Sequence, residues 1–165
     1  MTEVEALQRA LATLHQSVYG YGLAGAHLRT HIARDLALRH LDEERERRDR
    51  LAALVQRAGA TPAPAAPAYQ PPDAVTGREA ALHLLVRLET SASQAALNLV
   101  ASTTANEPAR REAVLWLIDA AATAQTWGAL AAQTSTTETG PLTGPAFPGQ
   151  PAASQPSTTP TSSAS

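Results

Sequence analysis

The feature that most constrains the fold is a run of nine charged residues, Asp42–Arg50, set inside an apolar helical pattern. Each residue of a helix turns by about 100°, so nine residues cover about two and a half turns and face every direction. Counting back from Leu51 by threes and fours places Arg48 and Glu44 on the stripe of that leucine. A helix that packs along its whole length therefore carries a carboxylate and a guanidinium toward the core.

The composition favours close-packed helices. Alanine dominates the 165 residues, aromatic residues make up 4% of them, and the length allows one domain with a substantial core. Because the chain has no cysteine, disulfides, thiolate catalysis and sulfur-bound metals are excluded. The net charge of −2 implies neither a nucleic-acid surface nor a polybasic membrane face. No apolar run reaches the roughly 18 residues of a membrane span, and no leader pattern opens the chain, so we expect a cytoplasmic protein.

Apolar residues recur at helical spacing in four segments. Thr2 and Glu5 form a capping-box pattern at the start of the first segment, and Gly59 is placed to stop the second. Asp73 is placed to cap the third segment, and Pro108 follows the start of the fourth. The predicted helices span residues 3–29, 32–58, 74–103 and 106–132.

The connection between the second and third helices is long. Residues 61–72 contain five prolines and no periodicity, which indicates an extended link. Up-down-up-down order is compatible with this link, but its length favours a crossover bundle. Residues 133–165 are rich in Ser, Thr, Pro, Gly and Ala and are predicted to be a disordered tail. The predicted fold is thus an all-α four-helix bundle over residues 1–132 with this tail.

Three glycines interrupt the first helix, namely Gly20, Gly22 and Gly25. Each weakens an isolated helix by about 1 kcal/mol relative to alanine. We expect close packing against another backbone, or a local kink, at these positions. The alternative is a ligand pocket lined by Tyr19 and Tyr21.

Four polar residues fall at nearly the same level, half way along the predicted bundle: His15, Glu44, Glu89 and Asp119. One interpretation is a metal site for iron, manganese or zinc, since carboxylates and imidazole are suitable ligands. A second is a buried ion-pair layer in which Arg48 or Arg47 neutralises Glu44 and Glu89. The third is coincidence. We favour the ion pair with Arg48, because a fixed cation beside the carboxylates repels a divalent metal.

At these residues the chain resembles an alanine-rich actinobacterial family of unknown function that carries a ferritin-like domain. The similar motifs are His15–Gly22, Arg45–Leu51 and Leu88-Glu89, together with Tyr69 in the link and Trp127 in the fourth helix. The resemblance covers about residues 3–132 and implies a ferritin-like four-helix bundle.

The resemblance also implies a departure from di-iron chemistry. The usual Glu-His pairs of the family stand here as Leu14-His15 and Glu43-Glu44. Ferritin-like di-iron sites use a Glu on each of two helices and Glu-x-x-His on each of the other two. This sequence contains no Glu-x-x-His, so the resemblance supports the fold and weakens the case for oxidase chemistry.

We therefore predict a non-catalytic binding or structural module with a degenerate metal site, no catalytic residue and no cofactor. Its expected partner is a second copy or another protein, without nucleic acid or membrane. The alternative is a di-metal protein in which His15, Glu44, Glu89 and Asp119 hold iron or manganese. That protein would act in oxygen or peroxide chemistry or in metal handling.

Overall fold

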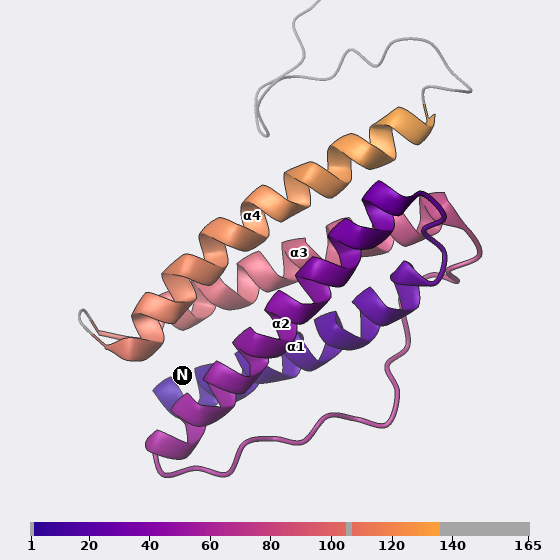
Figure 1. Cartoon of the computed structure of the whole chain (residues 1–165). Coiled ribbons are helices and arrows are strands. Elements are labelled where there is room, and N and C mark those ends of the chain that lie inside the picture. Colours follow the sequence, from indigo (N-terminus) through magenta and orange to yellow (C-terminus); the bar gives the residue numbers. More distant parts are fainter. Residues whose placement is uncertain (1, 105–106, 136–165) are drawn as a thin grey trace, which may run out of the picture.

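The computed structural model describes residues 2–104 and 107–135 and confirms the all-α four-helix bundle (Figure 1). No strand occurs in these two ranges. None of the helices within them is long and apolar enough to cross a membrane. The helices are α1 (Glu3–Gly25), α2 (His31–Arg57), α3 (Arg78–Ala101) and α4 (Pro108–Ser135).

Two of the helix ends follow directly from local sequence. The Thr2 hydroxyl accepts a hydrogen bond from the Glu5 N–H at 3.2 Å, and the Glu5 carboxylate accepts one from the Thr2 N–H at 2.9 Å. This is the predicted capping box. Helix α2 ends before Gly59, which has φ +78°, and the Ala60 N–H donates back to the Val55 carbonyl at 3.1 Å. Gly59 therefore stops α2 as predicted, in a Schellman motif.

Other helix ends differ from the prediction. Helix α1 ends at Gly25, before the expected turn, and α3 begins at Arg78 instead of residue 74. The N-cap of α3 is Gly77, so Asp73 does not cap this helix as predicted; its carboxylate pairs with Arg87 at 2.7 Å. Helix α4 runs past residue 132 to Ser135, so the boundary predicted between bundle and tail lies three residues too early. The predicted disorder of the remaining tail lies outside the described residues.

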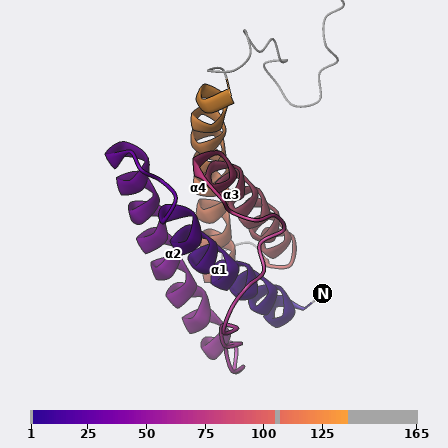
Figure 2. The same ribbon diagram turned by 90° about the vertical axis from the view of Figure 1, so that its right-hand side faces the viewer.

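The long link makes α2 and α3 run in the same direction, which is the crossover arrangement (Figure 1). Helix α1 packs against both α2 and α3, and α3 packs against α4. Helices α2 and α4 contact each other at few places and diverge along their length (Figure 2). The link lies along α1, where the Gln8 side chain donates to the Thr61 carbonyl at 2.7 Å.

Only one of the three glycines of α1 marks a close approach. A Cβ atom at Gly20 would lie 2.6 Å from Cδ1 of Leu88 on α3. At Gly22 and Gly25 a Cβ would meet no atom within 4 Å, so close packing occurs at Gly20 alone, and there against a side chain instead of the expected backbone.

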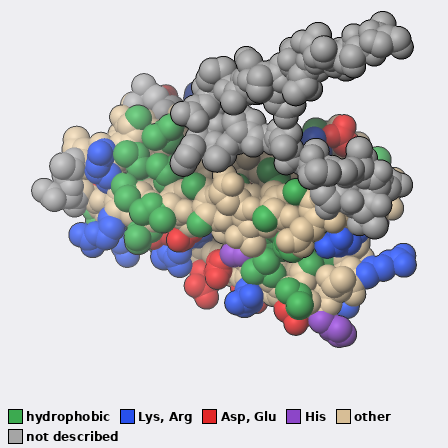
Figure 3. Space-filling model, turned by 90° about the horizontal axis from the view of Figure 1, so that it is seen from above, with side chains coloured by type: hydrophobic (Ala, Val, Ile, Leu, Met, Phe, Trp, Pro, Cys, Tyr) green, Lys and Arg blue, Asp and Glu red, His purple; other side chains and the backbone are tan. Residues whose placement is uncertain are grey.

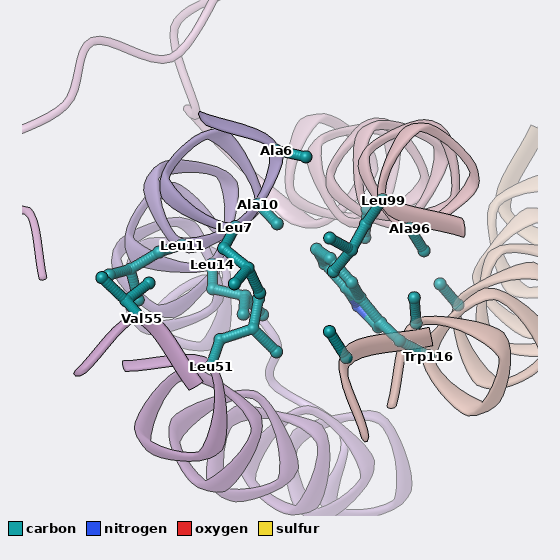
Figure 4. Packing of buried hydrophobic residues seen from close by; sticks show 14 residues of the cluster. Ala6, Leu7, Ala10, Leu11, Leu14, Leu51, Val55, Ala96, Leu99 and Trp116 are labelled. Atoms are coloured by element: carbon teal, nitrogen blue, oxygen red, sulfur yellow. The ribbon is translucent and has the colours of Figure 1, made fainter. Parts of the chain in front are cut away.

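The core consists of two apolar clusters at opposite ends of the bundle. One is built around Leu14, Leu51 and Trp116 (Figure 4), and the other around Leu85 and Trp127. Along every helix, one cluster ends and the other begins about half way. A polar layer separates them, and two residues of the charged stretch of α2, Glu44 and Arg47, lie in it.

Candidate functional site

The polar layer takes buried side chains from all four helices. In each helix the layer residue falls between the last member of one apolar cluster and the first member of the other. Because each side chain is at most 9% exposed, its polar atoms depend on partners inside the protein. The layer residues are Ser17 on α1, Glu44 and Arg47 on α2, Glu89 on α3 and Thr123 on α4.

Arg47 is the cation of this layer. Its guanidinium donates to Oε1 of Glu44 at 3.0 Å and to Oδ2 of Asp119 at 2.8 Å. Its Nε lies 3.7 Å from Oε1 of Glu112, a carboxylate that also accepts from Arg50 at 2.9 Å. Arg47 thus joins a buried carboxylate of its own helix to two acidic residues of α4.

A second set of hydrogen bonds joins α1, α3 and α4. The Tyr21 hydroxyl donates to Oε1 of Glu89, and it accepts a hydrogen bond from Nε1 of Trp127 at 3.0 Å. The His40 ring flanks both aromatic rings, with centroid separations of 6.2 Å to Tyr21 and 6.0 Å to Trp127. The phenol is therefore the centre of a chain of buried polar groups.

Burial sets the protonation of the layer. It raises the pKa of Glu89 to about 8, and the neighbouring Glu44 carboxylate adds to the rise. Burial also raises the pKa of Glu44, while Arg47 opposes that rise by stabilising the charged form. The pKa of Tyr21 is raised by burial and by Glu89. At neutral pH Glu89 therefore holds its proton. The Arg47 guanidinium, 3.0 Å from Glu44, balances the charge of that carboxylate.

The donor set does not fit a metal ion. Among residues 2–104 and 107–135, no group of three or more histidine and acidic side chains lies close enough together to hold one. Oε2 of Glu44 is buried and has no hydrogen-bond partner, but Oε1 of the same carboxylate carries the Arg47 guanidinium. One oxygen of Glu89 accepts from Tyr21. A divalent ion here would meet a fixed positive charge and too few ligands.

The predicted site residues are only partly brought together. Glu44 and Glu89 both lie in the layer. His15 points outward instead, and its Nε2 lies 3.1 Å from the carbonyl of Ala63 in the link. The Asp119 side chain is 60% exposed and reaches the layer only through Arg47.

The arginine assigned to the ion pair needs correction. Arg47, and not Arg48, binds Glu44, while the Arg48 guanidinium pairs with Asp49 at 2.7 Å on the surface. The rotation of α2 about its axis turns position 47, three residues after Glu44, toward the layer, and position 48, four residues after Glu44, toward the surface. Both spacings lie on one side of a helix, so the sequence pattern did not separate them.

Several other residues of the site, in the layer or hydrogen-bonded to it, were not predicted from the sequence. Ser17 and Thr123 carry no charge, so nothing in the pattern singled them out. Tyr21 had a usable signal, because it stands on the apolar seam of α1, and a buried phenol needs a hydrogen-bond partner. Trp127 carried the same signal through its indole N–H.

Comparison with known proteins identifies a family. The profile of the family described as Domain of unknown function (DUF4439) matches residues 6–152. The chain is also similar to the crystal structure of a conserved hypothetical protein, rv2844, from Mycobacterium tuberculosis. The two are 31% identical with a TM-score of 0.72, and the match covers 78% of this chain and 96% of the other. A search of curated proteins gives no match. The chain therefore belongs to the DUF4439 family.

Proposed function

We propose that this chain is a ferritin-like bundle that acts as a non-catalytic interaction module and associates with a second copy of itself through α4. The observation that carries this proposal is the exposed apolar face of α4. The make-up of the polar layer supports it by accounting for the centre of the bundle without a metal.

The polar layer has the position of a di-metal centre but different chemistry. Bundles that hold two metals bring a Glu from each of two helices together with Glu-x-x-His from the other two. Here the buried acids are Glu44 and Glu89, and the balancing charges are the guanidinium of Arg47 and a proton. Such a layer stabilises the unique packing of the helices without binding a metal, which favours a structural role.

The exposed face of α4 is the surface that most needs a partner. Seven large hydrophobic side chains are exposed within the described ranges. Three of them lie on α4 in a stretch of five residues: Val114 at 39%, Leu115 at 53% and Ile118 at 60%. Ala121 and Ala122 continue the face with small side chains that allow a second helix to approach. Hydrophobic side chains gather at the left of Figure 3, which looks down on the α4 side. Contiguous exposed apolar surface of this kind marks interaction sites.

A second copy fits this face in an antiparallel, two-fold arrangement. Pairing centred between Leu115 and Ile118 brings each residue against the other on the second copy. The same pairing brings Arg111 of one copy within about a turn of Asp119 of the other. Opposite charges would then flank an apolar centre, which is the usual anatomy of an interface.

Sedimentation equilibrium of the full chain tests the association. We expect a dimer for the natural chain and a monomer for Leu115→Glu, because a buried carboxylate without a partner opposes association. Leu97→Glu is the matched control, since Leu97 on α3 is 48% exposed and outside the face. We expect that control to remain dimeric, and both variants to keep the helical content of the natural chain in circular dichroism.

Two results would count against the proposal. One is a natural chain that is monomeric at every concentration measured. The other is a loss of association in Leu97→Glu as complete as in Leu115→Glu, which would place the interface elsewhere or show a nonspecific effect of charge.

A further inference from the structure

We propose that the proline-rich segment 141–151 of this chain binds the groove between α1, α3 and the link that Tyr19 and Tyr69 line. This binding is independent of association through α4. Four observations support it: the shape and chemistry of the groove, the spacing of the prolines, the range of the family profile and the distance that the chain must cover.

Apolar and aromatic side chains line the groove. Its volume is about 280 Å³, and its lining includes Leu84 and Leu88 of α3 together with Pro71 and Pro72 of the link. The rings of Tyr19 and Tyr69 meet edge to face, with centroids 5.6 Å apart and an angle of 63°. Tyr19 is one of three tyrosines in the chain, and it is 40% exposed.

These side chains suit a proline-rich ligand. Extended proline-rich segments bind grooves lined by aromatic rings, because they are already ordered and lose little conformational entropy. Their backbone carbonyls have no internal partners and need donors from the groove. Gln16, Gln70 and Arg87 also line the groove and carry such donors, and Arg87 pairs with Asp73 as well. Among the described residues, no acidic side chain lines the groove, so a neutral segment can enter it.

The sequence after α4 contains a segment with the required spacing. Pro145, Pro148 and Pro151 recur every third residue, and Pro141 precedes them. In a polyproline helix, which has three residues per turn, prolines at this spacing fall along one edge. Phe147, the one phenylalanine of the chain, lies among them, and the last charged residue before them is Glu138.

The family profile supports a role for this segment within the domain. It matches residues 6–152 and therefore extends 17 residues beyond the end of α4. It ends one residue after Pro151, so the whole proline repeat lies inside the family pattern.

The segment is long enough to reach the groove of its own chain. The last turn of α4 lies beside the first turn of α3, because the Arg78 guanidinium donates to the Thr134 hydroxyl at 2.6 Å. Leu84 and Leu88 lie six and ten residues farther along α3, or about 9–15 Å. Residues 136–144 span about 28 Å when extended, which also allows the path around α3. The segment of the same chain can therefore reach the groove without a second copy.

Paramagnetic relaxation in the full chain tests this binding. The chain has no cysteine, so Ala146→Cys gives a single site for a nitroxide label between two prolines of the repeat. We expect the amide signals of Gly20, Leu23 and Leu88 to lose most of their intensity and to regain it when the label is reduced. A label at Ser162→Cys is the matched control and should leave these three signals unchanged.

Two further samples show whether the signal loss depends on the groove and arises within one chain. Adding Tyr19→Ala, or replacing Pro145 and Pro148 by alanine, should restore the signals in the labelled Ala146→Cys chain. A mixture of isotope-labelled natural chain with spin-labelled, isotope-free chain should show no loss. Unchanged signals at the groove with the label at position 146 would overturn the inference. A loss that appears in the mixture as strongly would assign the groove to a second copy and overturn it too.

Discussion

Arg47 and Arg48 are neighbours in the chain, but their guanidinium groups have different surroundings. The Arg47 side chain is 9% exposed and contacts carboxylates on α2 and α4, whereas Arg48 pairs with an exposed Asp49. Removing one partner of a buried ion pair costs about 3–5 kcal/mol, because it leaves the other charge uncompensated. We expect Arg47→Ala to lower the unfolding free energy by that amount in urea denaturation.

Arg48→Ala is the matched control for that experiment. Its expected effect is within about 0.5 kcal/mol, as for most surface substitutions. Equal losses in the two variants would show that burial does not distinguish these arginines and would contradict the assignment of Arg47 to the layer.

The protonation of Glu89 makes stability depend on pH. Its pKa is about 8 in the folded chain against an ordinary value of 4.5, so between these values the folded state holds a proton that the unfolded state releases. The contribution is fully present below pH 4.5 and is lost as the pH rises toward 8. The slope from one proton is at most about 1.4 kcal/mol per pH unit.

Urea denaturation at several pH values between about 5 and 8 measures this effect. Glu44 contributes with the same sign because its pKa is also raised, so the informative quantity is the difference between the natural chain and Glu89→Gln. The amide keeps the size of the acid and has no proton to release in this range. We expect a flatter profile for the variant, and an unchanged slope would contradict the assignment.

At the scale of the elements, Tyr21 joins three helices through one hydroxyl. It lies on α1, donates to Glu89 on α3 and accepts from Trp127 on α4. Tyr21→Phe removes this hydroxyl and leaves two buried polar groups without a partner. Such a loss costs about 1–3 kcal/mol.

Thermal unfolding compares this variant with Tyr19→Phe. Tyr19 is two residues away on the same helix and is 40% exposed, so losing its hydroxyl should change stability by less than about 0.5 kcal/mol. If both variants unfold together with the natural chain, the hydroxyl of Tyr21 does not hold the helices together.

The pair α2 and α4 depends on charge more than on apolar contact. These helices meet at few places, and ion pairs of Arg47 and Arg50 with Asp119 and Glu112 connect them there. This explains why the run of charges from residue 42 to residue 50 stands in the middle of α2. Some of its members fill the layer, others bridge to α4, and the rest face water.

Over the whole molecule, periodicity predicted the architecture better than the site. Four apolar stripes predicted the four-helix bundle, and the long proline-rich link favoured the crossover order without excluding up-down-up-down, because link length only restricts the possible topologies. The level of Glu44 and Glu89 also followed from counting along the helices. What counting does not supply is the rotation of each helix about its axis.

That rotation decided the remaining residues. His15 is at the right level but faces the link, while Ser17, two residues later, faces the layer. Asp119 is displaced outward in the same way, and Thr123, one turn later, is buried. Successive side chains of a helix point in directions about 100° apart, so a shift of one residue turns a position that faces the layer into one that faces the surface. Tertiary packing sets this angle, and the local pattern does not.

We propose that a charge-balanced polar layer, and not a metal, occupies the centre of this bundle. Elemental analysis of the purified full chain, produced with iron and manganese supplied, tests it most directly. We predict less than about a tenth of an equivalent of either metal, because the site offers too few ligands and a fixed cation. A content of about one equivalent or more that is lost in Glu89→Ala would contradict this claim.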